Sequence, residues 1–179
     1  MGERMKQKNL SKILIGIAVM FMGCASSAGD VYYDKELPPE KTAVIVLLGW
    51  GSWGRSFTMK TYNGTPIAAG NRFVLPLGKA KFTADADDIA TSSTGRITTT
   101  SGARVSDVEF EITLTESGNL PARTGKYYVL IFEHPSDGPW GVGVYLFDSA
   151  EGGASIGMPE DKRVAFAPFM KDGKNVYTP

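Results

Sequence analysis

The chain has 179 residues, with 19 basic and 19 acidic side chains, one histidine and one cysteine. This length suits one domain with a sizeable core, and the balanced charge lacks the basic excess that a nucleic-acid partner requires. A lone cysteine excludes an internal disulfide, and with a single histidine it leaves no zinc ligand set of the usual kind. We therefore expect no metal and no cofactor.

The N-terminus has the order of regions found in a secretory leader. Basic residues at Arg4, Lys6, Lys8 and Lys12 precede an apolar run over 13–22, and small residues follow it. Basic, apolar and small regions in that order are typical of a signal peptide. The apolar run is about half of the roughly 20 residues that a membrane-spanning helix needs, which argues against a permanent transmembrane segment.

Cys24 lies where the apolar run meets the small residues. The stretch Phe21-Met22-Gly23-Cys24 resembles the lipobox of bacterial lipoproteins, which implies that residues 1–23 are removed and that Cys24 is lipidated. Two or more acyl chains would give a stable anchor. Two other interpretations stay open: a plain secretory signal that is cut after Ala28, and an incidental thiol. Removal of residues 1–23 leaves 15 basic and 18 acidic side chains, which again disfavours nucleic acid as a partner.

The remaining chain predicts a tether followed by strands. Residues 24–41 are polar and contain Pro38-Pro39, which favours an extended tether. Short β-branched or alternating runs predict strands over 42–48, 56–62, 66–69, 72–77, 79–84, 105–115, 126–132, 142–147 and 163–169. Asn63-Gly64 predicts a tight hairpin turn. We expect the polar stretch 86–103 to be a loop with an edge strand at 96–100.

Strands at this spacing indicate an all-β fold. We expect residues 42–179 to form a single antiparallel β-sandwich of the immunoglobulin or transthyretin type, after a signal helix over 1–23 and the tether over 24–41. Tyr127 and Tyr128 are adjacent in the strongest strand, so they lie on opposite faces and at most one of them points into the core.

Three motifs in this region carry a resemblance: Asn63-Gly64-Thr65-Pro66-Ile67, Leu75-Pro76-Leu77-Gly78 and Gly125-Lys126-Tyr127-Tyr128. They resemble the N-G-x-x-I, L-P-x-G and G-K-Y-Y motifs of small β-sandwich domains in bacterial envelope lipoproteins of unknown function, and the first half is similar to PEGA-like surface modules. The resemblance covers about 43–132 and informs the fold more than any activity. Together with the leader it implies a periplasmic or surface-facing lipoprotein, anchored to the membrane through Cys24, whose partners are envelope proteins or glycans.

Residues 49–54 match the pattern G-x-G-x-x-G after a predicted strand. A dinucleotide site of this kind needs a helix to follow the glycines, because the helix N-terminus holds the pyrophosphate. Residues 56–62 have the period of a strand instead. Trp50 and Trp53 would also crowd a turn where the backbone must approach a phosphate, so we interpret this segment as a glycine-rich loop between strands.

Two groups of titratable residues have ordinary interpretations. His134 lies between turn-forming residues, and we expect a solvent-exposed loop histidine rather than part of a catalytic triad. Asp85, Asp87 and Asp88 could bind calcium through oxygen ligands, but the glycine and distal glutamate of an EF-hand loop are missing. We expect these three residues to form a solvated acidic turn.

Trp50, Trp53 and Trp140 are the remaining candidates for a site. Loop aromatics can stack on sugars or anchor a partner, or they can seal the open end of a sandwich, and we expect Trp50 or Trp53 to pack near Trp140. We assign no catalytic residue, and we expect a structural or binding module of the cell envelope. The alternatives are a carbohydrate- or peptide-binding module that uses these aromatics, and an envelope hydrolase that uses carboxylates.

Overall fold

The computed structural model describes residues 31–32, 37–48, 55–68, 70–94, 97–120, 122–149 and 158–177. Strands dominate these residues, and short 3-10 helices are the helical elements assigned within them. The elements in chain order are β1 (Val31–Tyr32), η1 (Pro39–Lys41), β2 (Thr42–Leu48), β3 (Arg55–Tyr62), β4 (Thr65–Pro66), β5 (Arg72–Pro76), β6 (Gly78–Thr94), β7 (Ile97–Leu114), β8 (Gly118–Asn119), β9 (Thr124–Glu133), β10 (Gly141–Asp148), η3 (Glu160–Lys162), β11 (Arg163–Pro168), β12 (Met170–Lys171) and β13 (Lys174–Asn175).

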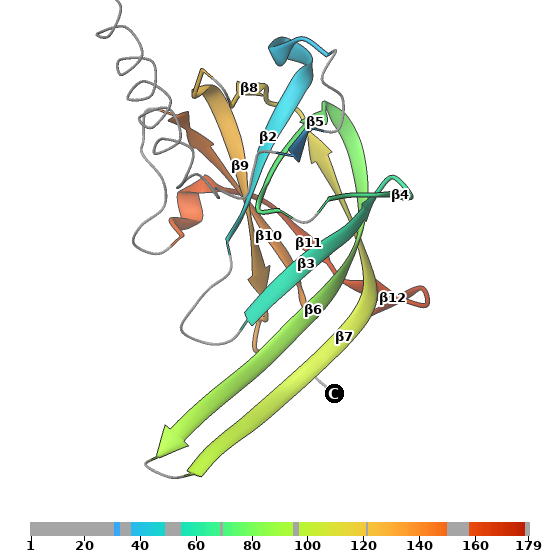
Figure 1. The fold of residues 1–179 in the computed structure, drawn as a ribbon, viewed down its shortest axis with the longest axis vertical. Coiled ribbons are helices and arrows are strands. Elements are labelled where there is room, and N and C mark those ends of the chain that lie inside the picture. Colours follow the sequence, from blue (N-terminus) through green and yellow to red (C-terminus); the bar gives the residue numbers. More distant parts are fainter. Residues whose placement is uncertain are drawn as a thin grey trace, which may run out of the picture.

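The strands form two sheets that pack on each other as an all-β sandwich (Figure 1). The seven-stranded sheet has the order β1-β5-β2-β9-β10-β11, with β8 paired to β9, and the six-stranded sheet has the order β13-β12-β7-β6-β3-β4. The predicted sandwich is thus confirmed. The predicted hairpin turn is present as well, because Asn63 and Gly64 both have positive φ, at 47° and 79°.

Two strand pairs depart from the antiparallel arrangement that the sequence predicts. β2 runs parallel to β9, with Val44 opposite Tyr127, and β1 runs parallel to β5. A hairpin forces neighbouring strands to be antiparallel, whereas a strand that returns to a sheet through a long connection has no such constraint. Here the connection from β2 to β9 includes the central strands of the six-stranded sheet, which explains the parallel pairing.

The main core lies between the two sheets and is rich in aromatic side chains. The ring of Phe110 stacks on that of Phe82 with a centroid distance of 5.0 Å, and it meets the edge of Phe169 at 5.7 Å. Tyr128 is buried in this core, while Tyr127 lies on the opposite face of β9, where its ring stacks on Phe147. The expectation for the two tyrosines is confirmed.

The stretch 86–103 is not the loop that the sequence predicts. It belongs to a long hairpin in which β6 and β7 pair from Asp88 opposite Ala103 to Thr94 opposite Ile97. The neighbouring strand β3 begins at Arg55, which pairs with Asp88. From Asp88 to the tip of the hairpin, the described residues of β6 and β7 therefore pair only with each other. This two-stranded arm extends well past the rest of the sandwich (Figure 1). Threonine is a strong strand former, which accounts for a ribbon where a polar composition suggests a loop.

The predicted tether contributes one short strand to the fold. Val31 and Tyr32 of β1 pair with Phe73 and Val74 of β5 at the edge of the seven-stranded sheet. The predicted signal helix, Cys24, Trp50 and Trp53 lie outside the described residues. Within the part of the chain that the structure describes, no helix is long and apolar enough to span a bilayer.

Candidate functional site

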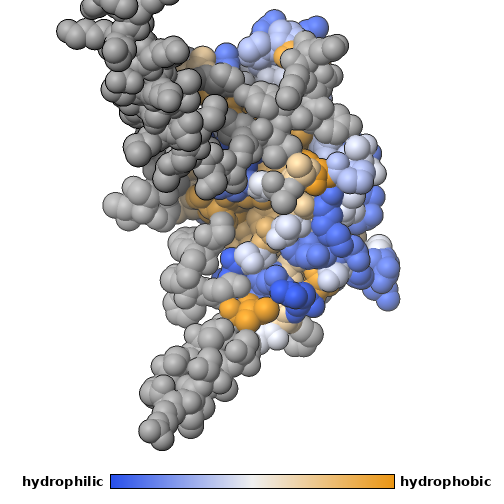
Figure 2. All heavy atoms as spheres, viewed as in Figure 1, coloured by the Kyte–Doolittle hydropathy of each residue, from blue (hydrophilic) through white to orange (hydrophobic). Residues whose placement is uncertain are grey.

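The outer face of the six-stranded sheet is polar and laced with cross-strand ion pairs. Lys81 Nζ lies 2.8 Å from Glu109 on the neighbouring strand, and Arg104 forms a two-pronged contact with Asp87. Figure 2 shows hydrophilic side chains gathered on the side of the molecule where β4 and β12 lie in Figure 1. This face has the half-solvated character that is usual for an antiparallel sheet.

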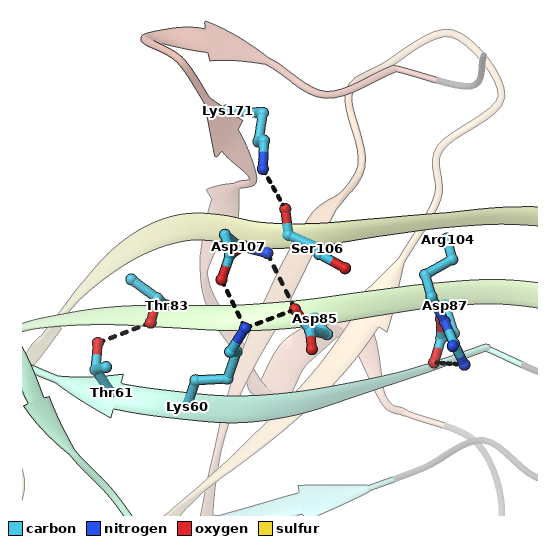
Figure 3. Close-up of polar contacts among 9 residues, drawn as sticks. All are labelled: Lys60, Thr61, Thr83, Asp85, Asp87, Arg104, Ser106, Asp107 and Lys171. Carbon is cyan, nitrogen blue, oxygen red and sulfur yellow. Dashed lines mark hydrogen bonds and ion pairs between the residues drawn. The ribbon is translucent and has the colours of Figure 1, made fainter.

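One ion-pair cluster on this face crosses three strands (Figure 3). Lys60 Nζ lies 2.6 Å from Asp107 and 3.3 Å from Asp85, and Asp85 also accepts a hydrogen bond from the backbone N–H of Asp107 at 3.0 Å. Lys60 is the extra residue of a bulge in β3, and Ser106 and Asp107 form a bulge in β7 opposite Asp85, so the cluster joins two β-bulges. Hydrogen bonds to the two aspartates raise the pKa of Lys60, and Lys60 lowers the pKa of Asp107. Bulges increase local twist, which suits the bend at the base of the arm.

The outer face of the seven-stranded sheet is apolar instead. A second hydrophobic cluster lies there, separate from the main core and built from Val129 and Ile131 of β9 and Tyr145 and Phe147 of β10. Leu48, Tyr127 and Met158 pack against this cluster. A sheet that is apolar on both faces is normally covered on both. The four side chains of this cluster are 2–6 % exposed, so they form a second core rather than an open surface.

A pocket of about 400 Å³ opens on this apolar face, and we call it the basic-rimmed pocket. Its floor includes Val44, Val46 and Leu48 of β2 with Tyr127 and Val129 of β9. Its remaining described lining residues are Arg72, Asn119, Leu120, Arg123, Thr124, Gly125, Lys126 and Ser149. Three of these are cations, and no carboxylate is present among the described lining residues.

The wall of the basic-rimmed pocket is the short hairpin from β8 to β9. Gly118 packs so closely on the backbone of β9 that a Cβ there would collide with the carbonyl oxygen of Lys126. At the other end of the hairpin, the Arg123 N–H donates to Leu120 O at 3.1 Å, and Arg123 has a positive φ of 50°. A left-handed backbone is costly for a residue with a side chain. Its side chain is exposed and forms no ion pair within the described part of the chain.

A second pocket of about 420 Å³ lies at the other end of β9 and has charged side chains among a largely apolar lining; we call it the Glu133 pocket. Glu133 Oε1 accepts a hydrogen bond from the Tyr145 hydroxyl at 2.6 Å, and Glu133 Oε2 lies 2.5 Å from Arg163 Nη2. Burial and the hydrogen bond to Glu133 raise the pKa of Tyr145 well above its ordinary value. Glu133 is the one carboxylate among the described residues lining this pocket, and both of its oxygens are already engaged.

His134 lines this pocket and is not the exposed loop residue that the sequence predicts. Its Nδ1 lies 2.9 Å from Asp88, its side chain is 18 % exposed, and its ring is 5.4 Å from that of Trp140. Asp88 also accepts from Arg55 Nε at 3.3 Å. The local sequence around His134 does signal a turn, but its distant partners are brought in by the packing of the two sheets.

The acidic turn predicted for Asp85, Asp87 and Asp88 is also wrong. All three residues lie within strand β6, and each forms an ion pair with a lysine or arginine on a neighbouring strand. Their cross-strand partners are far away in the sequence, which is why composition alone suggests a solvated loop. Among the described residues, no group of three or more histidine, cysteine or acidic side chains is placed to hold a metal ion.

Of the three tryptophans predicted as a site, Trp140 is the one within the described residues. It is 1 % exposed, and its ring lies 5.2 Å from that of Phe132. The side chain is thus part of the core rather than an open surface. Sequence reasoning did not single out Arg72, Arg123 and Lys126, although one signal was available: β9 is apolar at successive positions, which indicates a strand covered on both faces.

Comparison of this chain with known proteins finds no matching family model, no matching curated protein and no matching solved structure.

Proposed function

We propose that this protein is a lipid-anchored component of the bacterial cell envelope and acts as a non-catalytic binding module. The leader and the stretch Phe21-Met22-Gly23-Cys24 support the anchor and the location. The observation that carries the binding role is the basic-rimmed pocket, whose described floor is mostly aliphatic. A pocket of this volume, with an apolar floor and a few polar groups at its edge, is typical of a small-molecule site.

We prefer a binding role to catalysis because the described residues of the Glu133 pocket offer a single carboxylate whose two oxygens are already hydrogen-bonded. A hydrolase that works through paired carboxylates needs two of them across a cleft. The described lining of this pocket supplies Glu133 alone, held by Tyr145 and Arg163. Such a carboxylate is better suited to fixing β9, β10 and β11 together than to proton transfer.

The anchor is tested by growing cells with a palmitate analogue that carries an alkyne. Wild-type protein should incorporate the label and fractionate with membranes, and Cys24→Ser should do neither. Ser27→Ala, a neighbouring change outside the lipobox-like stretch, is the matched control and should behave as wild type. Labelling that persists in Cys24→Ser would show that the anchor is misassigned.

The binding role is tested with an uncharged photoreactive fatty alcohol added to membranes that contain the full-length protein. Mass spectrometry of the digested protein should place the label on peptides that contain Val46 or Val129. Val129→Asn should reduce this labelling, because the change makes the pocket floor polar, and Val164→Asn on the exposed edge of β11 should leave it unchanged. Absence of label from the pocket in wild-type protein would contradict the proposed binding role.

A further inference from the structure

We propose that the basic-rimmed pocket binds a single-chain fatty acid, with the carboxylate held by Arg123 and the chain lying over the floor of β2 and β9. This inference rests on the proposed binding function and names its ligand class. It is carried by three observations on the described residues: the charge of the rim, the backbone of Arg123 and the composition of the floor.

The charge of the rim selects an anion. Arg72, Arg123 and Lys126 line the pocket, and the described lining residues include no acidic side chain. Lys126 already pairs with Glu116 at 3.2 Å, whereas Arg123 forms no ion pair within the described residues. A planar guanidinium can donate two parallel hydrogen bonds to one carboxylate. Arg123 is therefore the group best placed to hold the head of the ligand.

The backbone of Arg123 points to a role for its side chain. The residue has a φ of 50°, a conformation in which glycine avoids the strain that a Cβ brings. The position lies in a hairpin turn, where glycine and asparagine are the usual occupants of left-handed conformations. Strained non-glycine residues of this kind cluster at functional sites. An arginine at this position lowers the stability of the fold, and we infer that it is retained because its side chain binds an anion.

The floor selects an apolar chain, and the volume limits how much of it fits. Val44, Val46, Leu48 and Val129 make most of the described floor aliphatic. The pocket volume of about 400 Å³ is at the small end of the range for small-molecule sites. We therefore assign one acyl chain to it rather than a two-chain phospholipid.

The test compares two photoreactive probes with the same chain, one a fatty acid and the other the corresponding alcohol, on full-length protein in membranes. In wild-type protein the acid should label pocket peptides several-fold more strongly than the alcohol. Arg123→Gln should lower labelling by the acid roughly tenfold, the effect of losing a charge-assisted hydrogen bond. It should leave labelling by the alcohol unchanged.

Three further variants keep the test decisive. Arg123→Lys should retain part of the preference for the acid, and Arg123→Gly should lose the preference while relieving the backbone strain. Arg104→Gln, an exposed arginine on the other sheet, should behave as wild type. Equal labelling by acid and alcohol in wild-type protein, or acid labelling that survives Arg123→Gln, would overturn the fatty-acid inference but leave the binding role in place. Absence of both labels from the pocket would overturn both.

Discussion

His134 Nδ1 lies 2.9 Å from a carboxylate oxygen of Asp88, and this contact joins the loop after β9 to strand β6 of the opposite sheet. An ionised carboxylate only accepts hydrogen bonds, so Nδ1 carries the hydrogen. Arg55 donates to the other oxygen of Asp88 at 3.3 Å. One aspartate thus serves donors from two further elements, close to the base of the β6/β7 arm.

We expect Asp88→Ala to destabilise the protein by roughly 1–3 kcal/mol, because it leaves the half-buried His134 and Arg55 donors without their acceptor. The free energy of unfolding from urea denaturation measures the effect. Asp137→Ala, an exposed residue in the loop that carries His134, should change stability by less than about 0.5 kcal/mol. Equal effects of the two substitutions would show that the inter-sheet contact contributes nothing specific.

Tyr145 predicts a loss of stability in alkaline solution. Its pKa in the folded protein is raised by burial and by the hydrogen bond to Glu133, so the neutral phenol stabilises the fold. That contribution is complete below the pKa of an unfolded tyrosine, about 10, and is lost as the pH rises through the higher folded value. Tyr145→Phe should therefore show a shallower fall of melting temperature above pH 10 than wild type. Tyr177→Phe, which removes an exposed tyrosine, should keep the wild-type slope.

Asp107 predicts the opposite behaviour in acid. Lys60 lowers the pKa of Asp107 in the folded protein, so the ionised carboxylate stabilises the fold. The contribution is present above the pKa of an unfolded aspartate and is lost as the pH falls through the lower folded value. Asp107→Asn should therefore lose less stability than wild type between about pH 4 and pH 2. High salt should weaken the difference, because the pair is exposed, and a difference that is insensitive to salt would contradict this origin.

The main core predicts large costs for truncation. Leu130 is fully buried between the sheets, and Leu130→Ala should cost roughly 2–5 kcal/mol, because it removes apolar contacts and leaves a cavity. Phe110→Ala should fall in the same range or slightly above it. Val164→Ala at the exposed edge of β11 is the control, since this side chain is 54 % exposed. A small effect at Leu130 would mean that the two sheets do not pack as described.

The loop that carries Trp50 and Trp53 keeps the prediction made from the sequence, since these residues lie outside the described part of the chain. We expect one of them to pack near Trp140, either sealing the sandwich or adding to a binding surface. If it seals the sandwich, replacing both residues with alanine should lower the melting temperature. If it binds, the same variant should keep its melting temperature and lose partner recovery from crosslinked envelopes. A variant that changes neither property would refute the hypothesis.

The sequence predicts the sandwich well because alternation with a period of two is a direct consequence of strand geometry. It fails at the β6/β7 arm for two physical reasons. Serine and threonine form turns as readily as ribbons, and the bulge at Ser106 and Asp107 shifts the alternation of β7 by one residue. The sequence also does not predict the surroundings of His134 and Arg123. His134 is held by a contact with Asp88 across the two sheets, and Arg123 lies in a turn where the left-handed residue is not glycine.

The parallel pairing of β2 with β9 has a consequence for the order in which the chain can fold. Val44 pairs with Tyr127, which lies more than 80 positions later in the chain, so the centre of the seven-stranded sheet cannot form before β9 is present. A chain that emerges from its N-terminus can pair β2 with β5 early, but the other edge of β2 stays open until most of the domain has been synthesised. Non-local pairings of this kind slow folding, because the entropy of a long loop is lost before any contact compensates for it. The hairpin β6/β7, with partners close in sequence, is free to form during that interval.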